Sequence, residues 1–219
     1  MDVPRLAHDR DTHLTPDEIA TEALRQFDAG GAPSIRSLAA ALKVAPTAIY
    51  YHYRSRDAII DAAVEKVWTE AFHIGIELVP DARAVTPDEI LVTAGLATRR
   101  AFVRHGLLAQ HLAEIPEIGQ RMVSNLSLLA DAFERLGLHG EEAAAAFHTY
   151  ASYVVGSTLF VTIRAVSGAP RLDEPDPTEP NADTRAALQR MMIVSATDPQ
   201  LDEDLFVRGL RQLVACLTP

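Results

Sequence analysis

The segment from Ser34 to Arg56 constrains the fold more than any other part of the sequence. It carries four basic side chains and no acidic one, inside a chain whose formal net charge is −10. An apolar stripe at helical spacing is followed by a Lys43–Ala45 turn and by a second short helical segment that Pro46 opens. Two short helices joined by a tight turn, the second rich in hydroxyl and aromatic groups, are typical of a helix-turn-helix that presents its second helix to the DNA major groove. The pattern therefore predicts a DNA-binding unit.

The helix that precedes this segment has a complete start signal. Thr15 is placed as the N-cap, Pro16 at the first helical position and Glu18 three residues after the cap. This arrangement is a capping box, and Gly30 can end the helix in the left-handed conformation. Similar signals predict the N-caps of the second, fourth and fifth helices at Ser34, Ser55 and Thr86.

Helical periodicity continues through the rest of the chain. After a fourth helix reaching about residue 75 and a fifth reaching about His105, we expect helices at Leu107–Ala113, Pro116–Leu136, Glu141–Val166, Ala182–Val194 and Pro199–Leu217. Residues 1–13 predict a disordered arm, and the proline-rich and acidic stretch 167–180 predicts a mobile loop. No segment alternates apolar and polar residues for long enough to predict a strand. The predicted fold is all-α, with about nine to ten helices.

Charge and cysteine content narrow the class of protein. Residues 1–68 hold eight Lys or Arg and ten Asp or Glu, whereas residues 69–219 hold twelve and twenty, so any contact with a polyanion must be local. One cysteine and an N-terminus without an apolar stretch predict a protein of the reducing cytoplasm. The uncharged stretch Ala143–Ile163 contains Ser, Thr, Tyr and His, which disfavours a membrane span and indicates a buried helix instead.

The stretch from Leu14 to about Trp68 resembles the head of the TetR-type (tetracycline-repressor-like) bacterial transcription regulators. The resemblance is carried by the Leu38-Ala39 pair, Val44, the run Ile49–Tyr53 and the run Arg54–Asp57. Two positions depart from the family pattern. Lys43 stands where glycine is frequent, so the turn is made either without a left-handed residue or at modest strain. Ala45 lacks the hydroxyl or acidic side chain that often precedes the recognition helix.

The resemblance implies a three-helix DNA-binding head, a connecting fourth helix and a helical body that binds a small molecule and dimerises. We therefore expect a helix-turn-helix domain at residues 14–58, with the connecting helix continuing to about 75, and a ligand-binding and dimerisation domain at residues 76–219. The expected partners are a second copy of the chain, a double-stranded inverted-repeat operator and an unknown small-molecule effector that releases the DNA. The family usually represses transcription.

Other classes of function are less consistent with the sequence. No Gly-rich phosphate loop, nucleophile elbow or paired metal-ligand motif is present, so we expect no enzymatic activity, cofactor or metal. One alternative is a helical ligand-binding or adaptor protein that does not bind DNA, which would leave the basic segment unexplained. A second alternative is a TetR-like regulator that has no small-molecule ligand.

The candidate DNA-binding residues are Arg36, Lys43, Pro46, Thr47, Ala48, Tyr50, Tyr51, His52, Arg54 and Arg56. Arg36 can pair with a phosphate or a guanine edge, and Thr47 can contact base edges; the alternatives are a solvated arginine and an ordinary first-turn residue. The resemblance implies that Tyr50 and His52 bind phosphates. Core packing is the alternative for Tyr50, and His52 is alternatively a cation at the end of its helix.

Two features of the body sequence predict pairing and ligand binding. The stripe formed by Phe206, Leu210, Leu213, Val214 and Leu217 fits a subunit interface, with intrachain packing as the alternative, and Cys216 beside it is expected to be a small buried hydrophobe. The pocket candidates are polar or aromatic residues set among apolar ones: Phe72, Gln110, His111, Asn125, His148 and Ser152.

Overall fold

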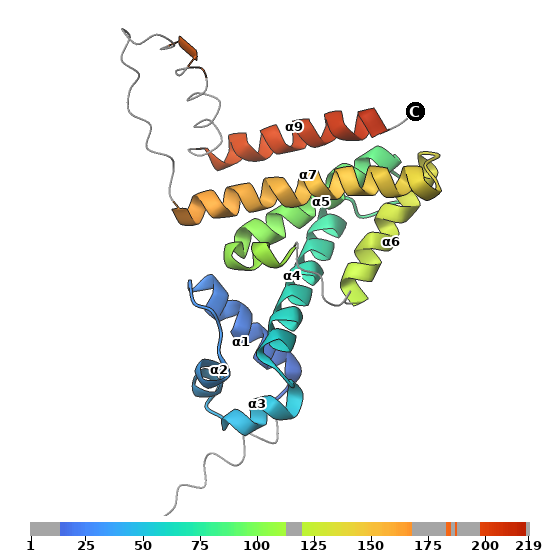
Figure 1. The fold of residues 1–219 in the computed structure, drawn as a ribbon. Coiled ribbons are helices and arrows are strands. Elements are labelled where there is room, and N and C mark those ends of the chain that lie inside the picture. The colour runs from blue at the N-terminus through green and yellow to red at the C-terminus, as the bar shows by residue number, and fades with distance from the viewer. Residues whose placement is uncertain (1–13, 113–119, 168–182, 185–186, 188–197, 218–219) are drawn as a thin grey trace, which may run out of the picture.

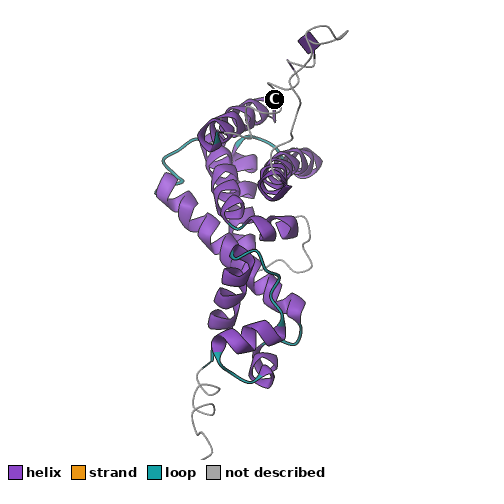
Figure 2. Ribbon diagram, turned by 90° about the vertical axis from the view of Figure 1, so that its left-hand side faces the viewer, coloured by secondary structure: helices purple, strands orange, loops and turns teal. Residues whose placement is uncertain are grey.

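The computed structural model describes residues 14–112, 120–167, 183–184, 187 and 198–217, and every regular element in these ranges is helical (Figure 1, Figure 2). The elements are α1 (Pro16–Asp28), α2 (Ile35–Leu42), α3 (Pro46–His52), α4 (Arg56–Leu78), α5 (Pro87–Arg104), the 3₁₀ helix η1 (Gly106–Leu112), α6 (Gln120–Arg135), α7 (Gly140–Ser167) and α9 (Pro199–Leu217). The prediction of an all-α fold is confirmed. The predicted arm, nearly all of the predicted loop and most of the predicted helix Ala182–Val194 lie outside the described residues.

Side-chain caps start four of these helices where the sequence predicts them. At α1 the Glu18 backbone N–H donates to Thr15 Oγ1 over 3.2 Å, and the Thr15 backbone N–H donates to Glu18 Oε2 over 2.8 Å. Ser34, Ser55 and Thr86 each accept a hydrogen bond from a backbone N–H in the first turn of α2, α4 and α5. The α3 N-cap is Ala45, which makes no side-chain bond, so α3 begins on the fixed φ of Pro46 alone.

The turn between α2 and α3 contains a left-handed residue. Lys43 has φ 59° and ψ 43°, and it is the one non-glycine residue with positive φ in the described part of the chain. Its backbone N–H donates to the Ala40 carbonyl, and the next residue, Val44, donates to the Ala39 carbonyl over 3.0 Å. Of the two expected ways to make this turn, the chain uses the strained one, which costs a side-chain-bearing residue about 1–2 kcal/mol.

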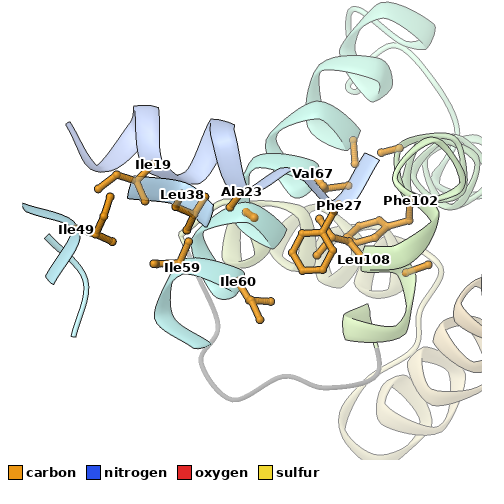
Figure 3. Packing of buried hydrophobic residues seen from close by; sticks show 14 of the residues in the cluster. Ile19, Ala23, Phe27, Leu38, Ile49, Ile59, Ile60, Val67, Phe102 and Leu108 are labelled. Carbon is orange, nitrogen blue, oxygen red and sulfur yellow. The ribbon is translucent and has the colours of Figure 1, made fainter. Parts of the chain in front are cut away.

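The head and the body share one apolar core. In Figure 1 the helices α1 to α3 occupy one end of the molecule, α4 runs from them into the body, and α7 and α9 lie together at the opposite end. Figure 3 shows buried side chains passing without a break from Leu38 and Phe27 in the head to Val67 on α4, Phe102 on α5 and Leu108 on η1. The head is therefore packed against the body and is not joined to it by a linker alone.

A second core lies inside the body, among α5, α6, α7 and α9. Phe206, Leu210 and Val214 of α9 are buried in it. The predicted subunit stripe on α9 therefore packs within the chain at these positions, which is the alternative stated above. Cys216 is exposed in the single chain, so the expectation that it is buried is wrong for the protomer.

The segment after α5 differs in type from the prediction. A helix was expected at Leu107–Ala113, and the structure has a 3₁₀ helix at Gly106–Leu112. It begins with a bond from the Leu108 backbone N–H to the His105 carbonyl over 2.8 Å. This three-residue spacing tightens the turn directly after α5 ends, which is the common use of short 3₁₀ segments.

Candidate nucleic-acid interface and body cavity

The recognition helix α3 is held by a few buried anchors, which leaves most of its surface free. Ile49 of α3 and Leu38 of α2 are both fully buried in the core of the head. Tyr53, directly after α3, donates its hydroxyl to the Pro16 carbonyl over 3.1 Å, and burial raises the pKa of this phenol. These contacts fix α3 against α1 at the end of the molecule farthest from α7 and α9 (Figure 1).

The predicted DNA-contact side chains of α3 lie mainly on its open side. Tyr51 is 86% exposed and Tyr50 is 54% exposed, so Tyr50 is not a core residue. Pro46 and Thr47 are exposed as well, whereas Ala48 and His52 are half-buried. The His52 ring packs edge-on against the Tyr51 ring, with 5.1 Å between the ring centroids. The exposed row presents a methyl, hydroxyls and aromatic faces, the groups that read base edges and bind phosphates.

Around α3 lie four exposed basic side chains: Arg36, Lys43, Arg54 and Arg56. None of them has a carboxylate partner within the described residues. Arg56 donates its Nε–H to the Pro33 carbonyl over 2.7 Å, which orients the guanidinium without neutralising it. The other basic residues in the described part of the head are paired, as Lys66 is with Asp17 over 2.6 Å. Among the described residues of the head, the basic side chains without a carboxylate partner are therefore those around α3.

The body contains a cavity of about 710 Å³ that is partly open to solvent and is lined by α4, the loop after it, α5, α6 and α7. The lining residues are Trp68, Ala71, Phe72, Gly75, Ile76, Val79, Pro80, Ala82, Ile90, Thr93, Ala94, Ala97, Thr98, Leu126, Leu128, Leu129, Phe147, His148, Tyr150, Ala151, Ser152, Val154 and Val155. This volume falls within the roughly 300–1,000 Å³ that takes drug-sized ligands.

The structure separates the predicted pocket residues into two groups. Phe72, His148 and Ser152 line the cavity, whereas Gln110 and His111 lie on η1 and do not. The His111 ring packs edge-on against Phe27 of α1, at the junction with the head. Asn125 belongs to α6, but its side chain is outside the described residues.

Several lining residues were not predicted. On α5 the positions Ile90, Thr93, Ala94, Ala97 and Thr98 follow one helical face, and Trp68 on α4 completes the wall. The spacing of the α5 residues was visible in the sequence. It marks an inward face, but it does not tell whether that face meets other side chains or an open space.

A polar cluster centred on the buried side chain of His105 joins the body to the head beside the first core. His105, at the end of α5, places Nδ1 2.8 Å from Asp28 Oδ1 of α1 and Nε2 2.8 Å from Glu70 Oε2 of α4. Arg104 also pairs with Glu70. This cluster ties α1, α4 and α5 together at one point.

No group of three or more His, Cys, Asp or Glu among the described residues is arranged to hold a metal ion. None of the helices in the part of the chain that the structure describes is both long enough and apolar enough to cross a membrane.

Solved structures share this arrangement along almost their whole length. The transcriptional regulator SCO7222 from Streptomyces coelicolor, described as a TetR, superposes with a TM-score of 0.72 at 20% identity, covering 94% of this chain and 98% of that chain. ActR from the same organism, in complex with actinorhodin, gives 0.71 at 25% identity, covering 93% and 95%. A TetR variant from Acinetobacter baumannii AYE in complex with minocycline gives 0.69 at 20% identity, covering 93% and 92%.

Sequence comparison leads to the same family. A curated relative, an HTH-type transcriptional regulator of Saccharopolyspora erythraea, is 28% identical over 146 residues, which are 66% of this chain and 59% of the relative. The alignment thus spans less than two thirds of that relative. The family model for bacterial regulatory proteins of the tetR family matches residues 9–63, around the exposed recognition helix. The model for the tetracyclin repressor-like C-terminal domain matches residues 80–217, which include most of the cavity. Since both models match in this order, the chain belongs to the TetR family of bacterial transcriptional regulators.

Proposed function

We propose that this regulator represses transcription as a homodimer bound to an inverted-repeat operator, and that a small molecule in the body cavity releases the DNA. The observation that carries the proposal is the exposed α3 row, flanked by basic side chains that have no carboxylate partner in the described residues. A surface of this kind at the tip of an otherwise acidic chain is suited to phosphates and base edges.

The head alone has too few basic groups for tight binding. Arg36, Lys43, Arg54 and Arg56 provide four candidate phosphate contacts per head, and binding that rests on so few contacts is weak at physiological salt. Two heads joined by subunit symmetry double the number of contacts. They place the two α3 helices in successive major grooves, roughly 34–36 Å apart, which requires an inverted-repeat site.

Subunit pairing has a candidate surface on the outer faces of α7 and α9. Phe160 and Ile163 on α7 and Leu201 and Leu205 on α9 are exposed apolar side chains. Gly156 lies on the same side of α7, and a Cβ built there meets nothing within 4 Å, so a second helix can approach closely. Because the α9 stripe predicted from the sequence is buried within the chain, we propose that these exposed residues make the subunit contact instead.

The cavity is connected to the head through α4. Trp68, Phe72 and Gly75 of α4 line the cavity, while the N-terminal part of the same helix packs against α1. A ligand that favours a tilted α4 would move the two heads away from operator spacing. Its effect is limited by its difference in affinity for the two states, and a coupling of about 1–3 kcal/mol is typical.

The test begins with genomic fragments of the source organism that the purified protein retains, followed by shift assays on the selected site. Arg36→Ala and Tyr50→Ala are each expected to weaken binding at least about tenfold, while light scattering still gives a dimer. Arg36→Ala also lowers the magnitude of the slope of log K against log salt by about 1.8, since each of two heads loses one neutralised phosphate worth roughly 0.9, whereas Tyr50→Ala removes an uncharged group and should leave the slope unchanged.

The matched control is Arg25→Ala, which removes one positive charge from the head but at a side chain already paired with Glu22. Its operator affinity is expected to stay within about twofold of the unmodified protein. If Arg25→Ala weakens binding as much as Arg36→Ala, the effect is one of net charge and the proposed interface is wrong. A protein that stays monomeric and retains no duplex at low salt would overturn the whole proposal.

A further inference from the structure

The wall of the body cavity carries no fixed charge. Among the described residues that line it, none is Asp, Glu, Lys or Arg. Its two titratable side chains are His148, which is exposed, and Tyr150. Tyr150 donates its hydroxyl to the Leu91 carbonyl over 2.8 Å, and burial raises the pKa of this phenol, so the group stays neutral. A charged ligand would therefore lose its hydration without meeting a counter-charge, which is costly.

The remaining wall is mostly aliphatic and aromatic. Trp68, Phe72 and Phe147 provide broad ring surfaces, and alanines from α5 and α7 leave room between them. Flat ligand rings gain area burial and stacking against such surfaces. The walls therefore match a ligand whose body is apolar and preferably planar.

The Thr93 hydroxyl in the wall has no hydrogen-bond partner among the described residues. Thr93 is only 9% exposed, and its hydroxyl makes no hydrogen bond within the described residues. Several other helical threonines donate back to their own helix, as Thr69 does to the Glu65 carbonyl over 2.9 Å and Thr158 to the Val154 carbonyl over 2.7 Å. Thr93 differs from them, although it is on a helix and buried, because its side chain borders the cavity.

A second threonine marks the other edge of the same face. Thr98 also lines the cavity, and its hydroxyl likewise has no hydrogen bond in the part of the chain that the structure describes. Since an unpaired buried hydroxyl is unfavourable, a ligand oxygen that pairs with Thr93 gains affinity and orientation together. The two hydroxyls thus provide anchors at opposite edges of the α5 wall.

We propose that the cavity binds an uncharged, largely apolar and aromatic molecule that carries a carbonyl or hydroxyl oxygen. Thr93 hydrogen-bonds this oxygen, and the Thr98 hydroxyl provides a second anchor at the opposite edge of the α5 wall. The inference rests on the proposed function, because this molecule is the proposed effector. It extends that function by naming the chemical class of ligand that the cavity wall favours.

Three naphthalene probes test the charge and oxygen requirements on the full-length protein at about pH 8. N-phenyl-1-naphthylamine is uncharged, 1-anilinonaphthalene-8-sulfonate adds one anionic group to the same skeleton, and Prodan is uncharged and carries a ketone. Each is titrated by its own fluorescence, and energy transfer from Trp68, the one tryptophan of the chain, reports proximity to the cavity. Both uncharged probes are expected to bind at least about a hundredfold more tightly than the sulfonate. The cationic dye berberine is expected to bind as weakly as the sulfonate.

Substitutions then separate the oxygen anchor from the cavity itself. Thr93→Val keeps the shape and removes the hydroxyl, so it should weaken Prodan about five- to tenfold and shift its emission to shorter wavelength, without changing the affinity for N-phenyl-1-naphthylamine. Ala151→Phe fills the cavity and should weaken both uncharged probes. Ala130→Phe is the matched control, because Ala130 is exposed on α6 and does not line the cavity.

Two results would overturn the inference: sulfonate or berberine binding within tenfold of the uncharged probes, or Prodan affinity and emission unaffected by Thr93→Val. Operator shift assays run on the same preparations distinguish these failures from failure of the proposed function. A protein that binds its operator but does not prefer uncharged probes is a regulator whose ligand class is misassigned. A protein that binds no operator refutes the regulator function, whatever the probes do.

Discussion

A buried ion pair between α5 and α9 offers a quantitative test of how the body is held together. The Arg99 side chain is 4% exposed and pairs with Asp202, whose side chain is 14% exposed. Arg99 also donates to Ser157 Oγ over 2.6 Å, and its guanidinium lies 4.6 Å from the centroid of the Phe206 ring. Burial lowers the pKa of the Arg99 guanidinium, and the Asp202 carboxylate partly offsets that effect.

Asp202→Asn removes the carboxylate that pairs directly with Arg99 and leaves the buried guanidinium in contact with the neutral Ser157 hydroxyl and the Phe206 ring. Breaking one side of a buried pair costs about 3–5 kcal/mol, and the near-complete burial of Arg99 places this variant in that range. Arg99→Met should cost less, about 2 kcal/mol, because Asp202 keeps some exposure and lies in the first turn of α9, where a negative charge is favoured. The double variant Arg99→Met/Asp202→Leu should recover most of the loss, since it leaves no unpaired charge.

Urea unfolding at one fixed protein concentration measures these free energies for the unmodified protein and the three variants. Glu203→Gln is the matched control. Glu203 pairs with Arg100 one position along both helices, but the two side chains are 25% and 37% exposed, so its loss should cost about 1 kcal/mol or less. If Asp202→Asn costs no more than Glu203→Gln, burial does not control the energy of this pair.

Three further outcomes follow from the head and from α9. Lys43→Gly relieves the left-handed strain and should stabilise the head by about 1 kcal/mol in thermal unfolding while weakening operator binding; a loss of stability would contradict the φ of 59°. Ala45→Ser adds the missing N-cap of α3 and should raise the free energy of unfolding by about 0.5–2 kcal/mol. Ala41→Ser, at an exposed position on α2 that is not an N-cap, is the control. The Arg100 guanidinium holds the pKa of Glu203 below its ordinary value of 4.5. The stability that the ionised Glu203 contributes is therefore present above pH 4.5 and is lost as the pH falls through the lower pKa of the folded state. Acid unfolding of Glu203→Gln should lack this contribution to the loss of stability.

Local chemistry explains why helix starts could be predicted. Thr15, Ser34 and Ser55 cap helices through bonds to residues three positions away, so the signal and its effect lie within one turn of sequence. The bounds of α9, Pro199–Leu217, agree with the prediction for the same reason, because a proline and an apolar period mark them. The fold of the head is encoded at this short range.

Tertiary contacts explain what the sequence could not tell. Spacing identified the apolar face of α9, but Phe206, Leu210 and Val214 are covered by the same chain and not by a second copy. Gly95 gave no signal, although a Cβ there would lie 2.6 Å from Leu210 Cδ2, so glycine is what lets α5 and α9 approach. His111 was predicted in the pocket from its chemical type, yet it packs against Phe27 at the head. In each case the partner is distant in sequence.

The helix α5 connects the three parts of the molecule on which the proposed mechanism depends. Near the start of α5, Thr93 lines the cavity. Further along α5, Arg99 and Arg100 form ion pairs with α9. At the C-terminal end of α5, Phe102 and His105 contact the head. Because protein interiors are close-packed, α5 cannot move toward one of these partners without a change at the other two. A ligand that displaces α5 is therefore felt both at α9, beside the proposed subunit interface, and at the junction of α1 and α4. In the proposed mechanism, a displacement of α5 would therefore shift the head in addition to the tilt of α4.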